Sequence, residues 1–491
     1  SPSPAAIDPE RRVARPADVR APAGRRRRPR PAHCRLRLAT MVAACSLALG
    51  VAAPAVALAQ PGAQPPAGDQ TSSGQASSGQ APSGETSSGT SSDLPSAGQA
   101  PSGGSPSGHV QAAQPAPGLQ VWTTYQGAAL AWLKGQAAAY GQQFDKQVEI
   151  TSMKLGDIKQ RALVEADKGK AADLFVGVPH DQFSALADAG VLADMGNYAT
   201  GRYLASLSAQ AARAFRYQGT LYGLPLSVQG PALIVNSDLV PTVPSTYAQL
   251  KKVAASLTGG GQYGFAVDAG NFYYAYGWLR TFGGYVFGTD AQGNADPTDL
   301  GLASAGSVAG LEELKALRFQ DGLLPPDSSY AALRKLFVTG KLAMIYDGPW
   351  AIPAIAQAKI PVVVAPMPPL ADGTPWHGLM NVDGVLVNHY STDRVGAANL
   401  AKWLTQVDAQ AALARQAGSI PASPQALARV HSDAIIHGFG EALQDAVAIP
   451  NVPAMGTVWG PMDDALGSIL ASPGSDVKAI LARAAATIGN P

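Results

Sequence analysis

The sequence has few cysteines and few charged residues. Only two of its 491 residues are cysteine, and Cys34 and Cys45 both precede every segment with the pattern of a folded domain. Neither a disulfide nor a cysteine-bound metal can therefore hold the fold together. Charged residues make up 14% of the chain, and the formal net charge is +1. Nucleic-acid binding needs a concentrated basic surface, and the only dense basic run is at residues 25–28, so we expect no nucleic-acid partner.

The chain from residue 118 onward also lacks the motifs of common enzyme classes. It contains no histidine spacing typical of a metal site, no G-x-S-x-G nucleophile turn and no P-loop. We therefore expect no metal and no cofactor. A domain without cysteine can work in an oxidising compartment without mispairing.

Residues 35–59 have the features of a secretory signal peptide. Basic residues precede an apolar stretch, which ends in Ala57-Leu58-Ala59, a typical A-x-A cleavage site. A membrane anchor is the first alternative, but Pro54 and the small residues at the end disfavour it. Lipid attachment at Cys45, which ends a lipobox-like VAAC, is the second. Residues 1–34 are rich in proline and arginine, and we predict that they are a non-globular extension.

Residues 60–117 consist mainly of glycine, serine, proline, glutamine and alanine. Such a segment cannot bury enough apolar surface to offset the entropy lost on ordering, so we predict a disordered linker.

The region from residue 119 alternates between strand and helix patterns. A strand pattern at 119–122 is followed by apolar residues at helical spacing, then by a strand at 148–151, a helix at 157–168 and a strand at 173–176. The residues on the apolar face of the first helix are Leu130, Leu133, Ala137, Tyr140 and Phe144. This order predicts parallel strands with right-handed crossovers. Ligands bind such sheets beyond the carboxyl ends of the strands, here in the turns at 123–127 and 177–182.

Further strand patterns lie at 232–235, 263–267, 342–346, 360–365 and 383–387, and an amphipathic helix ends the chain at 477–488. The region is too long for one α/β core, so we expect two lobes.

Four segments carry a resemblance to a known family. They are FVTGKLAMIYDGPW at 337–350, VPHDQF at 178–183, LYGLPLSVQGPALIVN at 221–236 and IPNVPAMGTVW at 449–459. The chain resembles the bacterial extracellular solute-binding proteins that deliver sugars to ABC importers, above all the maltose/maltodextrin-binding type. The matching segments follow the family's order over residues 119–491.

The resemblance implies an α/β, two-lobe periplasmic-binding-protein fold of type II, with central mixed sheets and an interlobe hinge. Lobe 1 would comprise residues 118–228 and 384–430, and lobe 2 residues 229–383 and 431–491. The protein would be a monomeric, non-enzymatic carbohydrate binder in the periplasm or outside the cell. It would deliver maltose, maltodextrin or a related oligosaccharide to the permease and ATPase of an ABC transporter.

Sugar capture needs aromatic rings that stack on pyranose faces and planar polar groups that bond hydroxyls. The resemblance implies stacking by Trp350, Trp459 and the run Phe272, Tyr273, Tyr274, and hydrogen bonding by Asp181. The other implied ligand-binding residues are Thr124, Tyr125, Gln126, Gln182, Gln229 and Asn271.

Several of these positions depart from the family's best-known maltose binder. Tyr125 and Gln126 replace an Asp-Lys pair, Gln182 replaces an arginine, and Gln229 and Asn271 each replace a glutamate. In addition, Gly177 and Val178 stand where an aromatic residue is expected, and Gly460 replaces a tyrosine. The implied pocket is less charged, which leaves maltose, maltodextrin, trehalose or another sugar open.

Other interpretations remain open from the sequence alone. The tryptophans and tyrosines could be core residues, and Asp181 could cap a helix. A glycoside hydrolase needs two facing carboxyl groups, for which Asp347 and Asp383 are more distant candidates beside Asp181. The fold could also bind a non-sugar ligand such as a polyamine, iron or an anion.

Overall fold

The computed structural model describes residues 118–291 and 293–489. The expected amino-terminal extension, signal peptide and linker, together with Cys34 and Cys45, lie outside the described residues. Within the described ranges, no helix combines the length and apolar character needed to cross a bilayer.

The first sheet has seven strands in the order β14-β6-β13-β3-β1-β2, with β15 paired to β13. Their bounds are β1 Leu119–Thr123, β2 Val148–Ser152, β3 Leu174–Pro179, β6 Gly223–Gln229, β13 Leu379–Val387, β14 Ile420–Pro421 and β15 Val447–Ala448. The predicted parallel pairing is present where β1 lies between β2 and β3. Strand β13 runs antiparallel to β3 and β6, so the sheet is mixed, as the resemblance implied.

The second sheet has four strands in the order β12-β7-β11-β8. Their bounds are β7 Ala232–Asn236, β8 Tyr263–Ala266, β11 Leu342–Asp347 and β12 Val362–Ala365. Strand β11 pairs antiparallel with β7 and parallel with β8. Two short hairpins complete the described strands: β4 Arg216–Tyr217 with β5 Thr220–Leu221, and β9 Phe287–Thr289 with β10 Ala295–Leu300.

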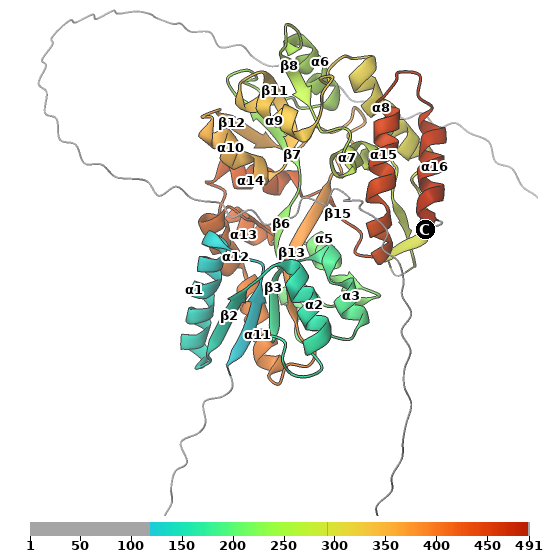
Figure 1. The fold of residues 1–491 in the computed structure, drawn as a ribbon. Coiled ribbons are helices and arrows are strands. Elements are labelled where there is room, and N and C mark those ends of the chain that lie inside the picture. Colours follow the sequence, from blue (N-terminus) through green and yellow to red (C-terminus); the bar gives the residue numbers. More distant parts are fainter. Residues whose placement is uncertain (1–117, 292, 490–491) are drawn as a thin grey trace, which may run out of the picture. The chain divides into compact units, whose positions relative to one another are not determined.

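Helices surround both sheets (Figure 1). Those in the first half of the described chain are α1 Gly127–Phe144, α2 Leu155–Glu165, α3 Ser184–Asp188, α4 Arg202–Ala205, α5 Ala209–Ala214, α6 Tyr247–Leu257, α7 Phe272–Thr281 and α8 Ala305–Phe319. Those in the second half are α9 Tyr330–Val338, α10 Ile352–Gln357, α11 Arg394–Thr405, α12 Val407–Ala417, α13 Pro424–Ala428, α14 Ala434–Ala442, α15 Trp459–Ile469 and α16 Val477–Gly489. The single-turn 3-10 helices are η1 His180–Gln182, η2 Met195–Asn197, η3 Pro349–Ala351 and η4 Pro453–Thr457.

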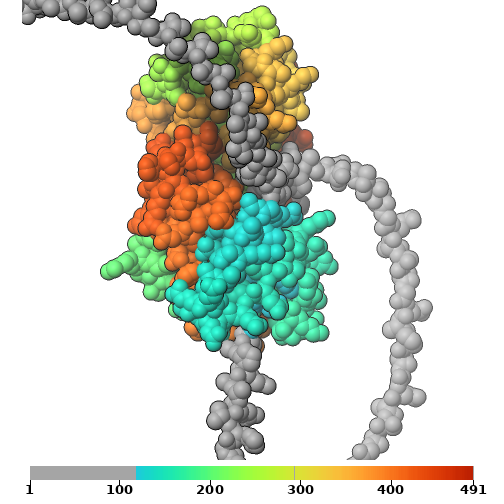
Figure 2. Space-filling model, turned by 90° about the vertical axis from the view of Figure 1, so that its left-hand side faces the viewer, coloured from blue at the N-terminus to red at the C-terminus, as the bar shows by residue number. Residues whose placement is uncertain are grey.

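Helix α1 packs against α11 and α12, although more than 240 residues separate them. Figure 2 shows these segments side by side on one face, with α1 in cyan and the later helices in orange. Most of the predicted apolar face of α1 is buried, but Phe144 is 47% exposed, which the sequence pattern did not predict. Phe144 is the last residue of the helix, and its ring lies beside Tyr140 at a centroid distance of 4.6 Å.

Alternate residues of β7 contribute to two different cores, because successive side chains of a strand point to opposite faces. Ile234 belongs to a core that also contains the interior of the first sheet. Leu233 and Val235 belong to a second core on the other face, with the rings of α7 and the apolar residues of α15 and α16. The second sheet is therefore covered on both faces, which explains its nearly continuous apolar strands.

His180 connects segments that are distant in the sequence, and it is completely buried. Its Nδ1 lies 2.9 Å from Asn381 Oδ1 on β13, and its Nε2 lies 2.8 Å from the carbonyl oxygen of Ile449, just after β15. The same Nδ1 is 3.1 Å from the amide nitrogen of Val382. His180 is therefore a structural residue of the turn.

A candidate ligand-binding site

The turns after β1 and β3 are joined by hydrogen bonds. The Thr124 hydroxyl donates to the carbonyl oxygen of Gly177 at 2.7 Å, and the Thr124 amide donates to Val176 at 3.3 Å. The two turns that the sequence singled out thus form one unit at the carboxyl edge of the first sheet. Since its hydroxyl is engaged by the backbone, Thr124 has a positioning role here.

Gly177 allows the ring of Tyr125 to lie against the second turn. It has a φ of +75°, and a Cβ atom at this position would lie 2.6 Å from Tyr125 Cε1. Both observations favour glycine, which alone accommodates the backbone conformation and the close ring contact. Gly177, which stands where the family has an aromatic residue, is therefore needed to leave room for the Tyr125 ring.

Asp181 is held by a short chain of polar side chains. Lys159 donates to Gln182 Oε1 at 3.1 Å, and Gln182 Nε2 donates to Asp181 Oδ2 at 2.9 Å. The other carboxylate oxygen, Oδ1, is buried and has no hydrogen-bond partner in the described structure. No side-chain cap bond is formed at the start of η1 or α3, so the structure does not support the alternative that Asp181 caps a helix. The network leaves one acceptor atom of Asp181 available for a ligand.

Tyr125 contributes a buried hydroxyl close to Asp383 and Ser227. The residue is only 8% exposed, and its hydroxyl makes no hydrogen bond of normal geometry within the described residues. Burial and then the charge of Asp383 raise the pKa of this hydroxyl. Gln126, the next residue, is exposed at the start of α1 and forms no cap bond with its side chain. An unpaired buried hydroxyl is costly, which marks this position as a candidate contact.

Sequence reasoning treated Asp383 as a distant carboxylate, but the fold brings it into the first-sheet part of the site. On β13 it is the register partner of both Pro179 on β3 and Ser227 on β6. Burial, followed by the charge of Asp181, raises the pKa of Asp383 to about 7. No local pattern could have shown this, because every residue of β13 is buried and the strand lacks alternation. Gln229 is half-buried at the end of β6, and its register partner is Asn381.

The residues expected at the start of α7 take different roles. Asn271 is the N-cap, and its Oδ1 accepts a hydrogen bond from the Tyr273 amide at 3.0 Å. Phe272 is completely buried in the second core, where its ring lies 6.1 Å from that of Trp459. We therefore assign Phe272 a packing role rather than ligand contact. Tyr274 donates to Asp347 Oδ1 at 3.2 Å and stacks on Tyr330.

Trp350 lies in η3, which follows β11 through the turn at Gly348 and Pro349. Its ring is half-buried and lies 6.1 Å from that of Tyr273. Gly348 permits this arrangement, because a Cβ atom there would lie 2.3 Å from Trp350 Cη2. Trp459 is also half-buried, at the first position of α15. Both tryptophans keep part of their ring surface free, which a stacking platform needs.

Electrostatic effects connect groups from the two sheets. Burial raises the pKa of the Tyr273 hydroxyl, and the nearby groups Tyr346, Asp347 and Asp181 raise it further. Asp181 follows β3 of the first sheet, whereas Tyr273 packs beside β11 of the second. A carboxylate of one lobe therefore acts on a ring of the other, as expected of a site that both lobes share.

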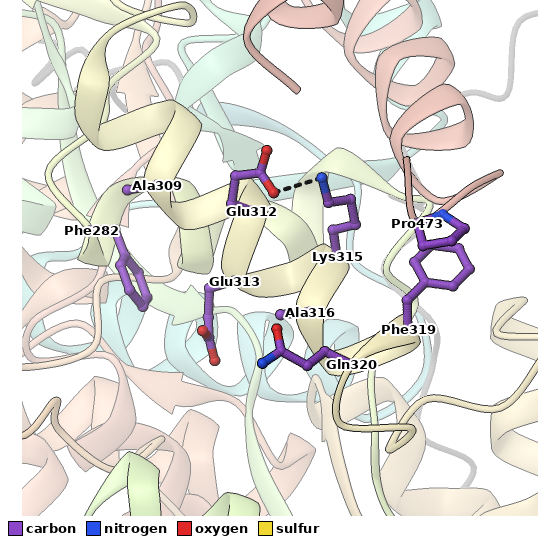
Figure 3. A pocket seen from close by; sticks show the side chains of 9 residues that line it. All are labelled: Phe282, Ala309, Glu312, Glu313, Lys315, Ala316, Phe319, Gln320 and Pro473. Atoms are coloured by element: carbon purple, nitrogen blue, oxygen red, sulfur yellow. Dashed lines mark ion pairs between the residues drawn. The ribbon is translucent and has the colours of Figure 1, made fainter. Parts of the chain in front are cut away.

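The cavity in Figure 3 lies elsewhere. Its volume is about 520 Å³, and it is lined mainly by α8 together with Phe282 and Pro473. The acidic groups there are neutralised, since Glu312 pairs with Lys315 at 2.6 Å and Glu313 pairs with Lys251 at 2.8 Å. None of the candidate residues lines it. With its charges already paired, this cavity is a weaker candidate than the polar and aromatic groups described above.

Asp347 gives a testable dependence of stability on pH. Burial raises its pKa to about 7, and hydrogen bonds from Gly348 and Tyr274 oppose the shift. The folded state then binds this proton more tightly than the unfolded state, so the stabilisation is full at low pH and is lost as the pH rises toward 7.

We expect the free energy of unfolding of the unaltered protein, relative to that of Asp347→Asn, to fall by roughly 2 to 4 kcal/mol between pH 4 and pH 7. The asparagine Oδ1 can keep both hydrogen bonds, so the comparison isolates the titration. Urea denaturation of both proteins across this pH range measures the difference, and a constant difference would contradict the prediction.

Comparisons with known proteins identify relatives. The chain is 29% identical over 346 residues to the maltotriose-binding protein of Pyrococcus abyssi, covering 68% of this chain and 74% of that protein. It is 26% identical over 350 residues to the maltooligosaccharide ABC transporter solute-binding lipoprotein of Streptococcus pneumoniae, covering 68% and 80%. Among solved structures, the maltotriose-binding protein of Thermus thermophilus bound with maltotriose is 37% identical, with a TM-score of 0.61 and coverage of 76% of this chain and 99% of that one.

The structural likeness confirms the predicted two-lobe α/β fold. Residues 135–438 match the family model described as bacterial extracellular solute-binding protein. Because this match spans more than half of the chain, the protein belongs to the bacterial extracellular solute-binding proteins.

Proposed function

We propose that the protein captures a maltooligosaccharide between its two lobes and presents it to the permease and ATPase of an ABC transporter. The observation that carries the proposal is the combination of partly free indole rings with buried, unsatisfied polar atoms. Trp350 and Trp459 come from the second lobe, and the Tyr125 hydroxyl and Asp181 Oδ1 come from the first. Rings suit the apolar faces of pyranoses, and the polar atoms suit their hydroxyls.

The relatives support the same ligand class, since all three reported above are named for maltotriose or maltooligosaccharide. Gln126 and Gln229 supply amides near the same edge, and amides bond neutral hydroxyls without adding charge. The Gln182 amide is bonded to Lys159 and Asp181 and therefore positions Asp181. Asn271 keeps only its amide nitrogen for this purpose, because its oxygen caps α7.

We place lobe 1 at residues 118–228 and 384–430 and lobe 2 at residues 229–383 and 431–491. A ligand that contacts both lobes has a higher affinity for the closed arrangement and therefore shifts the population toward it. Closure would be the signal that the transporter reads.

The protein would act as a monomer outside the cytoplasm. The family's extracellular description and the signal-peptide pattern at 35–59 support this location. Lipid attachment at Cys45 is the less favoured alternative to release of the chain after Ala59.

A thermal-shift screen of the purified protein tests the ligand class. The panel contains maltose, maltotriose, maltotetraose, trehalose, a galactooligosaccharide and spermidine. A ligand at about 100 times its Kd stabilises the folded state by about 2.7 kcal/mol. We expect maltotriose or a longer maltodextrin to raise the unfolding temperature most, and stabilisation by spermidine alone would contradict the proposal.

A glycoside hydrolase is the second candidate, because such an enzyme needs two neighbouring carboxyl groups and the pairing of β13 with β3 brings Asp383 near Asp181. Long incubation with maltotetraose, followed by chromatography of the sugar, separates the two functions. We expect saturable binding and unchanged sugar, whereas release of shorter sugars would establish hydrolysis.

A further inference from the structure

Asp383 is a largely buried carboxylate. The residue is 8% exposed, its side chain has no hydrogen bond or ion pair with a described residue, and its oxygens are not among the fully enclosed unpaired atoms, so they remain accessible from the site. It lies on the central strand β13, opposite Pro179 at the carboxyl end of β3. The register shifts directly after it against β6, between Asp383 and Gly384, and one residue later against β3. Asp383 is therefore at the edge of the sheet where the turns after β1 and β3 also lie.

The groups around Asp383 increase the free-energy cost of burying its charge. The closest identified charge is the Asp181 carboxylate, which repels it. The Tyr125 hydroxyl is near enough to feel the charge of Asp383, and although the Ser227 side chain is close, it forms no hydrogen bond of normal geometry. Asp181 Oδ1 is also unpaired. Three polar groups from three chain segments thus lie together, and two of their atoms, the Tyr125 hydroxyl oxygen and Asp181 Oδ1, are fully enclosed without a hydrogen bond of normal geometry.

A buried carboxylate without a donor destabilises the folded state, and an asparagine at this position would relieve the repulsion. Groups kept in such an arrangement are characteristic of functional sites. The missing element is a molecule that donates hydrogen bonds to carboxylates and accepts one from a phenol. A sugar hydroxyl does both at once.

We propose that Asp383 is a ligand-binding residue that, together with Asp181 and Tyr125, holds hydroxyl groups of the bound oligosaccharide. This inference rests on the proposed function and adds to it a contact that the family resemblance did not supply. A ligand hydroxyl would donate to the Asp383 carboxylate and accept from the Tyr125 hydroxyl, so that the buried polar atoms become paired only in the complex.

The first test compares the sugar-free proteins. We expect Asp383→Asn to unfold at an equal or higher temperature than the unaltered protein, because like-charge repulsion is removed. The matched control is Asp167→Asn, which changes an exposed aspartate that forms no hydrogen bond or ion pair in the described structure. A lower unfolding temperature for Asp383→Asn, or its failure to fold, would show that Asp383 serves the fold and would overturn the proposal.

The second test measures maltotriose affinity by titration calorimetry. We expect Asp383→Asn and Asp383→Ser to bind roughly 10- to 100-fold more weakly, since a hydrogen bond to a charged acceptor is lost. The control Asp167→Asn should bind as the unaltered protein does. Binding by the unaltered protein with equal affinity of both Asp383 variants would overturn this inference alone. Failure of the unaltered protein to bind any sugar of the panel would overturn the proposed function and this inference with it.

A set of singly deoxygenated maltotrioses identifies the hydroxyl. For the analogue that lacks the contacted hydroxyl, the affinity difference between the unaltered protein and Asp383→Asn should disappear, because the interaction is already absent. A difference that stays the same for every analogue would show an indirect effect and would overturn the direct contact.

Discussion

Replacement of Trp350 by alanine is expected to weaken maltotriose binding by about 1 to 3 kcal/mol, through the loss of ring stacking on the sugar. The half-buried indole follows β11 directly and lies beside Tyr273, so its removal takes away a platform without opening the strand itself. Titration calorimetry measures the change, and tryptophan fluorescence on addition of sugar provides a second readout.

The control for this prediction is Phe144→Ala, which removes an aromatic ring that is 47% exposed at the end of α1. It should leave the affinity unchanged. If Trp350→Ala binds maltotriose as tightly as the unaltered protein, Trp350 is not part of the site.

Replacement of Gly177 by alanine is expected to lower the free energy of unfolding by about 2 to 4 kcal/mol. About 1 kcal/mol of this comes from the positive φ, and the remainder comes from the contact of the new methyl group with the Tyr125 ring. That contact would be at 2.6 Å if nothing moved. Urea denaturation measures the loss. We also expect weaker maltotriose binding, because the displaced ring carries a hydroxyl of the candidate site.

Gly190→Ala is the matched control. Gly190 has a similar φ of +69°, but nothing lies within 4 Å of a Cβ built there. Gly190→Ala should lower the free energy of unfolding by only about 1 kcal/mol, the part that comes from the positive φ. Equal losses for the two variants would mean that the ring contact contributes nothing.

Several parts of the candidate site could be predicted from the sequence because they depend on local structure. A strand followed by Gly348, Pro349 and Trp350 turns where glycine and proline allow it, and the indole lies in that turn. The turns after β1 and β3 were predicted as places for ligand because ligands bind beyond the carboxyl ends of parallel strands. Thr124 and Gly177 are bonded there.

Other assignments needed the structure. Phe272 and Tyr273 are adjacent in the sequence, yet Phe272 faces the second core and Tyr273 contacts Trp350. Asn271 was expected to bind ligand, but its side-chain oxygen accepts a hydrogen bond in the first turn of α7. An asparagine at the start of a helix can either cap the helix or bind a ligand, and the sequence alone does not distinguish the two roles.

The sequence by itself determined the succession of strands and helices, the turns that follow them and the family to which the chain belongs, because these depend on short-range periodicity and on motifs. Only the tertiary structure decided that Asp383 lies near Asp181, two residues that are about 200 positions apart. Their proximity comes from the antiparallel pairing of β13 with β3. Pairing register is set by the packing of whole strands, and a slip of one residue would turn Asp383 to the other face of the sheet.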